Sequence, residues 1–479
     1  MVYCGGQSNH PRLAPLWSPV PSTDAFSSTK DSQSYMCDAT HPPIDSLRSP
    51  VPLLGDSMCN ATQARLDSLQ SPVPSLDMFG IPPSPQSHMC NVTDSISQTK
   101  WIKPTSKSHD LPKIGSFTQH ECFENILGQE EHCLYVNSNF SSGRGMSIFT
   151  RPSILKEDFS QLPIFKSDSF VVTQAERRSV PFNVTPIAGK GIGALATRQI
   201  SKGEVIISDH AATVIIVEFS AIHHPSFGDI CVSAFDLLPS PTGSLLMKLD
   251  AAGHTRVERV HTAIARNAFE TPHGSEEVLH YAVVPEPSVF NHECRPNSAF
   301  FFDKKTLRVY INAVRDIAMG EEITIAYRDM KASRAERQAS IAHYGFQCKC
   351  SHCSMSAEES KASDERIQEI DTILDHLADY SDKSKANLDM ADRLIQLYRE
   401  ERFDGRMAEP YTLATMAYNS FGEIDEVKKL ATLARAAGIL FAGPAWAELS
   451  AIEEMQEDPK SHWSYNVRQG MRSRQTTNE

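Results

Sequence analysis

Three cysteines stand within six residues in the segment Cys348-Lys-Cys-Ser-His-Cys353. In a chain whose thiols stay reduced, such a cluster indicates a site for a soft metal ion, and zinc in tetrahedral coordination is the expected ion. Three sulfur ligands leave a fourth position, which a distant residue, His352, or water and substrate could fill. A redox or incidental cysteine cluster is the alternative. If the segment binds zinc, the fold has to bring a fourth ligand to it.

The length and charge of the chain limit the remaining possibilities. A chain of 479 residues is long enough for two or three domains. Its net charge of -13 argues against holding nucleic acid by a general basic surface. The first residues lack the features of a signal peptide, and no run of about 18 apolar residues predicts a membrane span. We therefore expect an intracellular protein, in the nucleus and/or cytoplasm, whose eleven cysteines are thiols or metal ligands rather than disulfides.

The first part of the chain is rich in Ser, Pro, Thr and Asn, and this composition predicts a disordered arm over residues 1–175. The arm contains imperfect repeats, in which Ser-Pro-Val-Pro begins at Ser18, Ser49 and Ser71. They are either duplicated linker or a tether whose Ser-Pro sites are phosphorylated and bind a partner. A second group of possible metal ligands lacks the spacing of a known zinc module, and we do not expect it to bind metal; its members are His120, Cys122, His132 and Cys133.

Short runs rich in β-branched and aromatic residues predict a domain of small sheets over residues 180–356. Within it, Val257, Val260 and Ile264 fall on one face of a helix, so we expect a helical insert at about 220–285. After Cys353 the apolar spacing becomes helical, which predicts a domain of helical hairpins over residues 360–460. Residues 461–479 are expected to be a disordered tail.

Two further motifs precede the cysteine cluster. Asn291-His-Glu-Cys-Arg-Pro-Asn297 offers Cys294 as a fourth thiol, and Gly320-Glu-Glu-Ile-Thr-Ile-Ala-Tyr327 ends a predicted strand. With the cysteine cluster, these motifs stand in the order found in SET-domain protein-lysine methyltransferases, which this chain resembles from about Val180 to Met355. The likeness is greatest to the SET and MYND-domain group. The interval between the two SET halves holds only Cys231, so the chain resembles the relatives that lack the MYND zinc finger.

The resemblance implies a fold, a cofactor and a set of site residues. The fold is an α+β, β-rich SET fold of small sheets with a helical insert and a zinc-binding post-SET segment at 344–356, followed by the α-helical hairpin domain. The cofactor is S-adenosyl-L-methionine, and its expected contacts are Gly189, Lys190, Gly191, Asn267, Asn291, His292, Tyr327 and Phe346. The expected structural zinc ligands are Cys294, Cys348, Cys350 and Cys353. For Tyr327 and Phe346 the alternative is ordinary core packing.

The implied catalytic residues are Tyr327 and Tyr344, which would line a narrow channel for a lysine side chain. Methyl transfer is a direct displacement that needs alignment and a neutral amine, and an unperturbed lysine with a pKa of about 10.4 is protonated. A dry aromatic channel disfavours that charge. The implied substrate is a lysine of a histone or another protein, and the acidic chain favours a basic segment. The sequence does not indicate the target protein or the oligomeric state.

Two departures from the family pattern bear on activity. Glu293 stands where the family usually has Ser, and no aromatic residue near Arg259 to His261 matches the one that many relatives place before Asn267. A catalytically weak or inactive SET-fold binding module that recruits protein partners is therefore the alternative function. A zinc-dependent hydrolase is disfavoured, because no open ligand set with an adjacent base is present.

Overall fold

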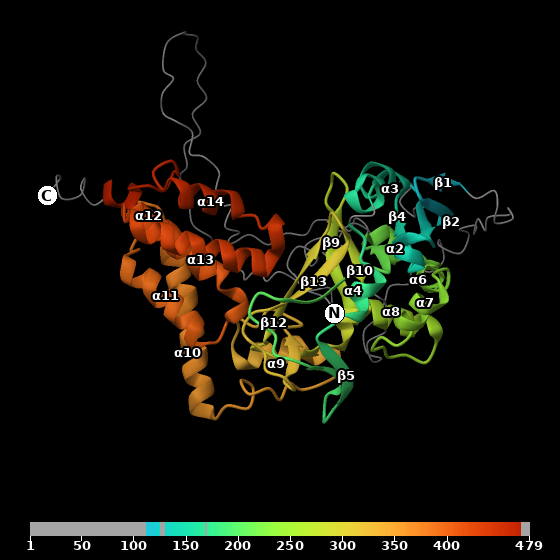
Figure 1. Ribbon diagram of the computed structural model, residues 1–479, viewed down its shortest axis with the longest axis horizontal. Coiled ribbons are helices and arrows are strands. Elements are labelled where there is room, and N and C mark those ends of the chain that lie inside the picture. Colours follow the sequence, from blue (N-terminus) through green and yellow to red (C-terminus); the bar gives the residue numbers. More distant parts are fainter. Residues whose placement is uncertain (1–111, 125–129, 168–169, 471–479) are drawn as a thin grey trace, which may run out of the picture. The chain divides into compact units, whose positions relative to one another are not determined.

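The computed structural model describes residues 112–124, 130–167 and 170–470 (Figure 1). Most of the predicted N-terminal arm, including its three repeats, and residues 471–479 of the predicted tail lie outside these residues. The described part of the chain has three sheets and two groups of helices. It contains no helix long and apolar enough to cross a membrane.

The largest sheet has seven strands in the order β1-β2-β3-β4-β8-β10-β9. Its strands are β1 (Lys113–Ile114), β2 (Phe117–Phe123), β3 (His132–Asn137), β4 (Met146–Thr150), β8 (Thr213–Ile216), β10 (Val278–Val283) and β9 (Ala268–His273). Strands β4 and β8 run parallel, and the other neighbours run antiparallel. Every residue of β3, β4 and β8 is buried, so these strands lack the alternation that marks a half-exposed strand.

Two smaller sheets carry the predicted motifs. The four-stranded sheet has the order β11-β14-β6-β5 and is formed by β11 (Asn291–His292), β14 (Glu322–Ile325), β6 (Gly191–Ala196) and β5 (Phe182–Ile187). The three-stranded sheet has the order β12-β13-β7 and is formed by β12 (Ser298–Asp303), β13 (Arg308–Ala313) and β7 (Val205–His210). Strands β11 and β14 pair in parallel, with Asn291 opposite Thr324 and His292 opposite Ile325. This pairing brings the Asn291 motif beside the strand that leads to Tyr327.

The prediction of a disordered arm up to residue 175 is wrong for its last part, because β1 to β4 belong to the large sheet. Phe117, Leu134 and Phe149 are fully buried in the same core as Ile215 of β8. Short helices follow, namely α2 (Phe140–Gly143), α3 (Pro152–Glu157) and α4 (Gln174–Arg178). The Ser/Pro-rich composition of the first hundred residues therefore does not describe the segments that form strands β1 to β4.

A disulfide joins Cys122 of β2 to Cys133 of β3. The two residues are direct partners across antiparallel strands, with their Cα atoms 4.0 Å apart. The prediction that all cysteines are thiols or metal ligands is wrong for this pair. His132, between them in the sequence, hydrogen-bonds instead to a carboxylate oxygen of Glu218 at 2.9 Å.

The helical insert contains α5 (Phe219–Ile222), α6 (Phe227–Asp236), α7 (Ser240–Leu246) and α8 (Arg256–Asn267). Helix α8 begins at a capping box, in which the Thr255 side chain accepts from the Glu258 amide and the Glu258 side chain accepts from the Thr255 amide. The insert is helical only to Asn267. Residues 268–283, predicted as part of it, form the β9–β10 hairpin of the large sheet.

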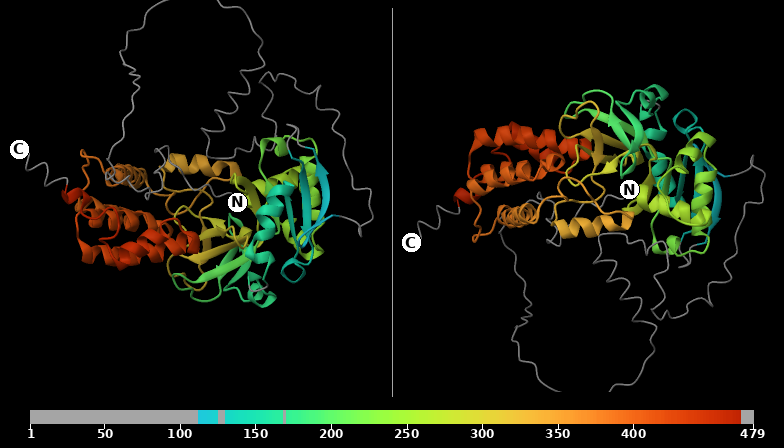
Figure 2. Two further views of the ribbon diagram at one scale, coloured as in Figure 1. Left: turned by 90° about the horizontal axis from the view of Figure 1, so that it is seen from above. Right: turned by 90° about the horizontal axis from the view of Figure 1, so that it is seen from below.

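The helices that follow the sheets are α9 (Arg334–Ile341), α10 (Ala357–Ala378), α11 (Leu388–Glu400), α12 (Ala408–Ser420), α13 (Ile424–Ala442) and α14 (Leu449–Glu457). Helices α10 to α14, coloured orange to red, lie side by side in both views of Figure 2. Residues 461–470 are not a disordered tail as predicted. Arg468 is buried there, and its Nη2 donates to the carbonyl oxygens of Leu377 and Asp379.

We expect buried histidines to make the fold acid-sensitive. Burial lowers the pKa of His280 to about 3, whereas an unfolded histidine titrates near 6.5. Between these values the unfolded chain binds more protons than the folded chain, so the free energy of unfolding falls as the pH falls. The titration of this one residue should lower the free energy of unfolding by about 2 kcal/mol between pH 7 and pH 5.

Urea unfolding of the wild type and of His280→Gln at several pH values measures this contribution. The variant should show a flatter pH dependence, although it starts from a lower stability at pH 7. Burial also lowers the pKa of His210 and of His462, each to about 4. Both proteins contain these two histidines, so their effects on the pH dependence cancel when the proteins are compared. Equal slopes for the two proteins would contradict the assignment to His280.

Candidate active site and metal centre

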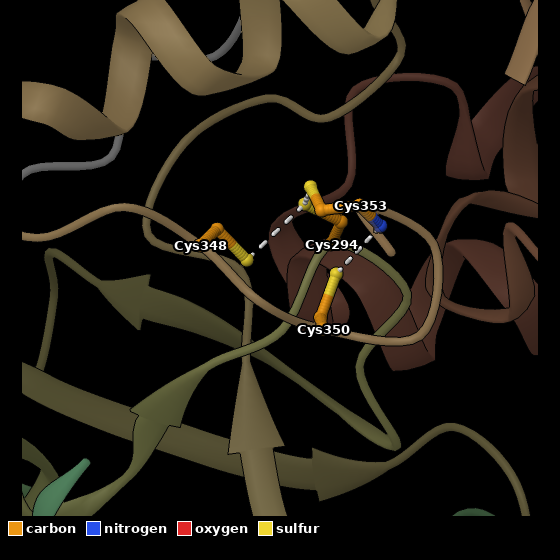
Figure 3. A group of neighbouring side chains, drawn as sticks. All are labelled: Cys294, Cys348, Cys350 and Cys353. Carbon is orange, nitrogen blue, oxygen red and sulfur yellow. Dashed lines mark hydrogen bonds between the residues drawn. The ribbon is translucent and has the colours of Figure 1, made fainter. Parts of the chain in front are cut away.

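The structure brings together the four cysteines that the motifs indicated. Cys294 follows β11, and the other three lie on the loop between α9 and α10, so that all four sulfur atoms converge in Figure 3. The four Sγ atoms lie within 4.8 Å of one another, and all four residues are buried. The Sγ of Cys294 is 3.9 Å from that of Cys348 and 3.5 Å from that of Cys353.

These distances fit a tetrahedral zinc ion. A zinc–sulfur distance of about 2.3 Å places neighbouring ligands of a tetrahedron about 3.8 Å apart. Hydrogen bonds from the Cys294, Cys348 and Cys353 thiols lower the pKa of Cys350, which favours the thiolate form that binds metal. His352 was an alternative fourth ligand, but its Nε2 lies 3.1 Å from a carboxylate oxygen of Glu401. The four thiols therefore form a closed ligand set.

A buried carboxylate connects this loop to the helices that follow. Glu401 accepts from Arg295 Nη2 at 2.8 Å and from Ser363 Oγ at 2.8 Å, and its other oxygen accepts from Arg366 Nε at 2.7 Å. Arg295 directly follows the ligand Cys294, and its Nη1 donates to the Cys294 carbonyl oxygen at 2.9 Å. Burial opposes ionisation of Glu401, but hydrogen bonds from His352, Arg295 and Ser363 lower its pKa below the ordinary value.

Tyr327 lies at the end of β14 and is fixed by two hydrogen bonds. Its hydroxyl donates to the Phe290 carbonyl oxygen at 2.9 Å, and its amide donates to His292 Nδ1 at 3.2 Å. Burial raises the pKa of the Tyr327 phenol, so the hydroxyl stays protonated at neutral pH. Its ring centroid is 5.0 Å from that of Tyr344 and 6.4 Å from that of Phe346.

The aromatic group therefore includes both predicted catalytic residues and two predicted cofactor contacts. The ring of His292 lies 5.3 Å from Tyr327 and 6.3 Å from Phe346, between centroids. Burial lowers the pKa of His292 to about 4, so its imidazole is neutral at physiological pH. Phe346 remains 40% exposed, which is more than ordinary core packing would leave.

The predicted glycine turn joins β5 to β6 and is open on its outer side. Gly189 and Gly191 have φ of +73° and +79°, values that favour glycine. No heavy atom of the described residues lies within 4 Å of a Cβ built on either one. Lys190 of this turn forms an ion pair with Glu322 at 2.7 Å. The turn thus has room for a ligand beside its backbone.

Glu322 also holds Asn291, a role that the sequence did not indicate. Asn291 Nδ2 donates to Glu322 Oε1 at 2.9 Å and to the Ile192 carbonyl oxygen at 3.1 Å. A Cβ added to Gly193 would lie 2.7 Å from Asn291 Nδ2, so a glycine is required where this amide meets β6. The position of Glu322 within Gly320-Glu-Glu was the one available signal for this role.

Asn267 lies at the end of α8, where its Nδ2 donates to the carbonyl oxygens of Asp250 and Ala263. A Cβ added to Gly345 would lie 3.8 Å from Arg266 Nη2, so the end of α8 is close to the loop that carries Tyr344 and Phe346. The Arg266 side chain thus reaches that loop, and the amide nitrogen of Asn267 is already bonded within the protein.

Glu293, the acidic departure from the family pattern, does not point freely into solvent. Its Oε1 is buried and has no hydrogen-bond partner among the described residues. Burial and, to a smaller extent, the neighbouring Cys350 raise the pKa of its carboxyl to about 8.

Residues 191–328 match the SET domain family. The segment that holds most of the two small sheets and Tyr327 therefore matches a SET domain. It is similar to histone-lysine N-methyltransferase set5 of Schizosaccharomyces pombe, with 28% identity over 190 residues that cover 36% of this chain and 56% of that protein.

Two other relatives match shorter segments. Histone-lysine N-methyltransferase ATXR2 of Arabidopsis thaliana is 43% identical over 74 residues, which are 15% of this chain and 16% of that protein. Histone-lysine N-methyltransferase SMYD3 of Homo sapiens is 35% identical over 88 residues, which are 18% of this chain and 20% of that protein. The chain thus spans about half the length of set5 and less of the other two relatives. The predicted resemblance to the SET family, near the SMYD group, is confirmed.

The cysteine cluster predicts a metal content. The protein should contain roughly one zinc ion per chain, and Cys350→Ser should lose most of it, because one of four thiolates is removed. Elemental analysis after dialysis measures the zinc, and the melting temperature should fall with it. Cys231→Ala is the matched control, since Cys231 is a buried thiol of α6 outside the cluster. Unchanged zinc in the Cys350 variant would contradict the site.

The buried carboxylate predicts a large stability effect. Glu401→Gln keeps the shape of the side chain but leaves the buried guanidinium of Arg295 without its counter-charge. We expect a loss of about 3–5 kcal/mol in the free energy of unfolding, measured by guanidinium chloride titration. Glu400→Gln, at the neighbouring and more exposed position, should cost less than about 1 kcal/mol. Similar losses for the two variants would argue against the network.

Proposed function

We propose that this protein transfers a methyl group from S-adenosyl-L-methionine to a lysine side chain of a protein. The observation that carries the proposal is the group formed by Tyr327, Tyr344, His292 and Phe346 directly beside the four-cysteine cluster. The names of the relatives support a protein-lysine substrate, and a histone is one candidate. We place the protein in the nucleus and/or cytoplasm on the same ground.

The residues around the glycine turn would hold the cofactor. S-adenosylmethionine, when bound, supplies the sulfonium methyl group. Gly189, Lys190 and Gly191 would approach it with their backbone, and Asn291 is already oriented by Glu322 for a further contact. His292 would contribute its backbone, and Phe346, which is partly exposed, would cover the adenine. Asn267 would add a contact through its side-chain oxygen, because its nitrogen is bonded within the protein.

Tyr327 and Tyr344 would form the walls of the lysine channel. Two aromatic rings with centroids 5.0 Å apart provide apolar surface and little hydration for a charged ammonium group. The channel therefore favours the neutral amine that the displacement requires, and alignment of its lone pair with the methyl group supplies the main rate advantage. The Tyr327 hydroxyl, held by the Phe290 carbonyl oxygen, fixes the position of the ring.

The zinc ion would act structurally. A closed set of four thiolates leaves no coordination position for Lewis-acid chemistry. Its role would be to fasten the loop that carries Tyr344 and Phe346 to Cys294, which follows the Asn291-His292 strand.

Methyl transfer to core histones and to a whole-cell protein extract tests the proposal. Tyr327→Phe should lower incorporation of labelled methyl roughly a hundredfold, because the hydroxyl that orients the ring is lost. Tyr135→Phe is the matched control, since its buried hydroxyl has no hydrogen-bond partner among the described residues. It should keep wild-type activity. No transfer by the wild type, with cofactor binding intact by calorimetry, would support the binding-module alternative instead.

A further inference from the structure

Arg328 directly follows Tyr327 and carries a buried, incompletely paired charge. The residue is only 8% exposed. Its Nε and Nη1 atoms are buried and have no hydrogen-bond partner among the residues that the structure describes. The guanidinium carbon lies 5.6 Å from the centroid of the Tyr344 ring. A cation–π contact of this kind stabilises an arginine only in part.

Such an arrangement is unfavourable unless something else binds the guanidinium. The guanidinium group of an arginine is a cation with five N–H donors and no acceptor. A buried charge without hydrogen-bond partners costs several kcal/mol. Arg295 is buried nearby and has partners around Glu401. Arg337 is also buried and lacks a partner for its Nε, but its Nη1 donates to the Ala332 carbonyl oxygen at 2.6 Å. Arg328 differs from both because two of its nitrogens lack partners among the described residues.

Arg328 lines a small pocket with a cavity volume of about 60 Å³. Phe300, Met330, Phe403 and Phe441 form apolar parts of its wall. A pocket of this size accepts one small polar group of a ligand, and its apolar wall offers that group few hydrogen-bond partners besides the arginines.

The charges around the pocket leave one buried positive charge uncompensated. Four arginines line it, namely Arg295, Arg328, Arg402 and Arg406. Arg402 is exposed, and Arg328 is buried with no ion pair among the described residues. Glu401 pairs with Arg295, and Asp329 pairs with Arg406 at 2.9 Å. A single carboxylate from a ligand would balance the site.

The pocket lies close to the proposed lysine channel. The centroid of the Tyr344 ring lies 5.0 Å from that of Tyr327 and 5.6 Å from the Arg328 guanidinium carbon. Ala326 and Arg328, the two sequence neighbours of Tyr327, both line the pocket. A substrate with its lysine beside Tyr327 would therefore place residues close to that lysine within reach of Arg328.

We propose that Arg328 binds the carboxylate of an acidic residue that lies within a few positions of the target lysine in the substrate. The pocket then selects lysines with a neighbouring Asp or Glu, even though the chain as a whole is acidic. This inference rests on the proposed lysine methyltransferase function. The free carboxylate would satisfy the buried Nε or Nη1 and would gain a charge-assisted hydrogen bond.

Peptide binding to the full chain, in the presence of S-adenosylhomocysteine, tests the inference without methyl transfer. The probes are two sets of fluorescein-labelled peptide libraries with a central lysine. In one set Glu is fixed at a single position between −3 and +3, and in the other set Gln replaces it. We expect Glu at one or more positions to tighten binding by roughly tenfold or more, the range of a hydrogen bond to a charged group. Arg328→Met should abolish this preference.

Arg402→Met is the matched control, because Arg402 lines the same pocket but is exposed and donates to Ser351 Oγ. It should keep most of the Glu preference. Arg328→Lys keeps a positive charge without the planar guanidinium and should retain part of the preference. The melting temperature of Arg328→Met should not fall below that of the wild type, because the variant removes a buried, incompletely paired charge.

Three results would overturn the inference, namely equal binding of the Glu and Gln libraries, a Glu preference that survives in Arg328→Met, and no binding of any library. Methyl transfer is measured separately with labelled S-adenosylmethionine. A Glu preference that depends on Arg328, without transfer, would contradict the proposed function and leave the carboxylate site in place. Methyl transfer without a Glu preference would support the proposed function and contradict the carboxylate site.

Discussion

The position of the cysteine loop depends on one buried ion pair, between Arg295 and Glu401. Both side chains are almost fully buried, and Glu401 accepts hydrogen bonds from residues of three separate segments. A carboxylate can be buried only when such donors replace its water. Because Arg295 follows the ligand Cys294, the pair ties the cysteine cluster to the end of α11. The helices therefore determine the position of the loop on which the aromatic site depends.

The same physical rule explains how the site around Tyr327 is arranged. Its polar groups are oriented by bonds within the protein, as in the pairing of Asn291 with Glu322 and of the Tyr327 hydroxyl with Phe290. Burial keeps His292 largely uncharged near neutral pH. The result is a site with aromatic walls and few free charges, which suits a reaction that consumes a neutral amine.

Local motifs predicted the residues around Tyr327 and the cysteine cluster better than the first strands of the large sheet or the buried Glu401. The spacing of the cysteines and the Asn291 and Tyr327 motifs indicated groups that the structure brings together, because each motif lies on one strand or one loop. The sequence does not indicate strands β1 to β4, which follow a long Ser/Pro-rich segment. Strand β1 has only two residues, the five central residues of β2 are all half-buried, and β3 and β4 are buried throughout, so none of the four shows a clear alternation. Glu401 carries no local signal either. A glutamate near a helix end is usually exposed, and only the tertiary fold shows that this one is buried.

Arg328 and Glu401 show two outcomes of burying a charge. Glu401 has partners for both of its oxygens, so its burial stabilises the join between the cysteine loop and the helices. Arg328 has an aromatic ring and an apolar pocket around it, but lacks partners for two of its nitrogens among the described residues. A charged side chain whose hydrogen-bonding positions are all filled within the protein has none left for a ligand. A charge that is incompletely paired at the wall of a pocket is more consistent with a binding role than with a purely structural one.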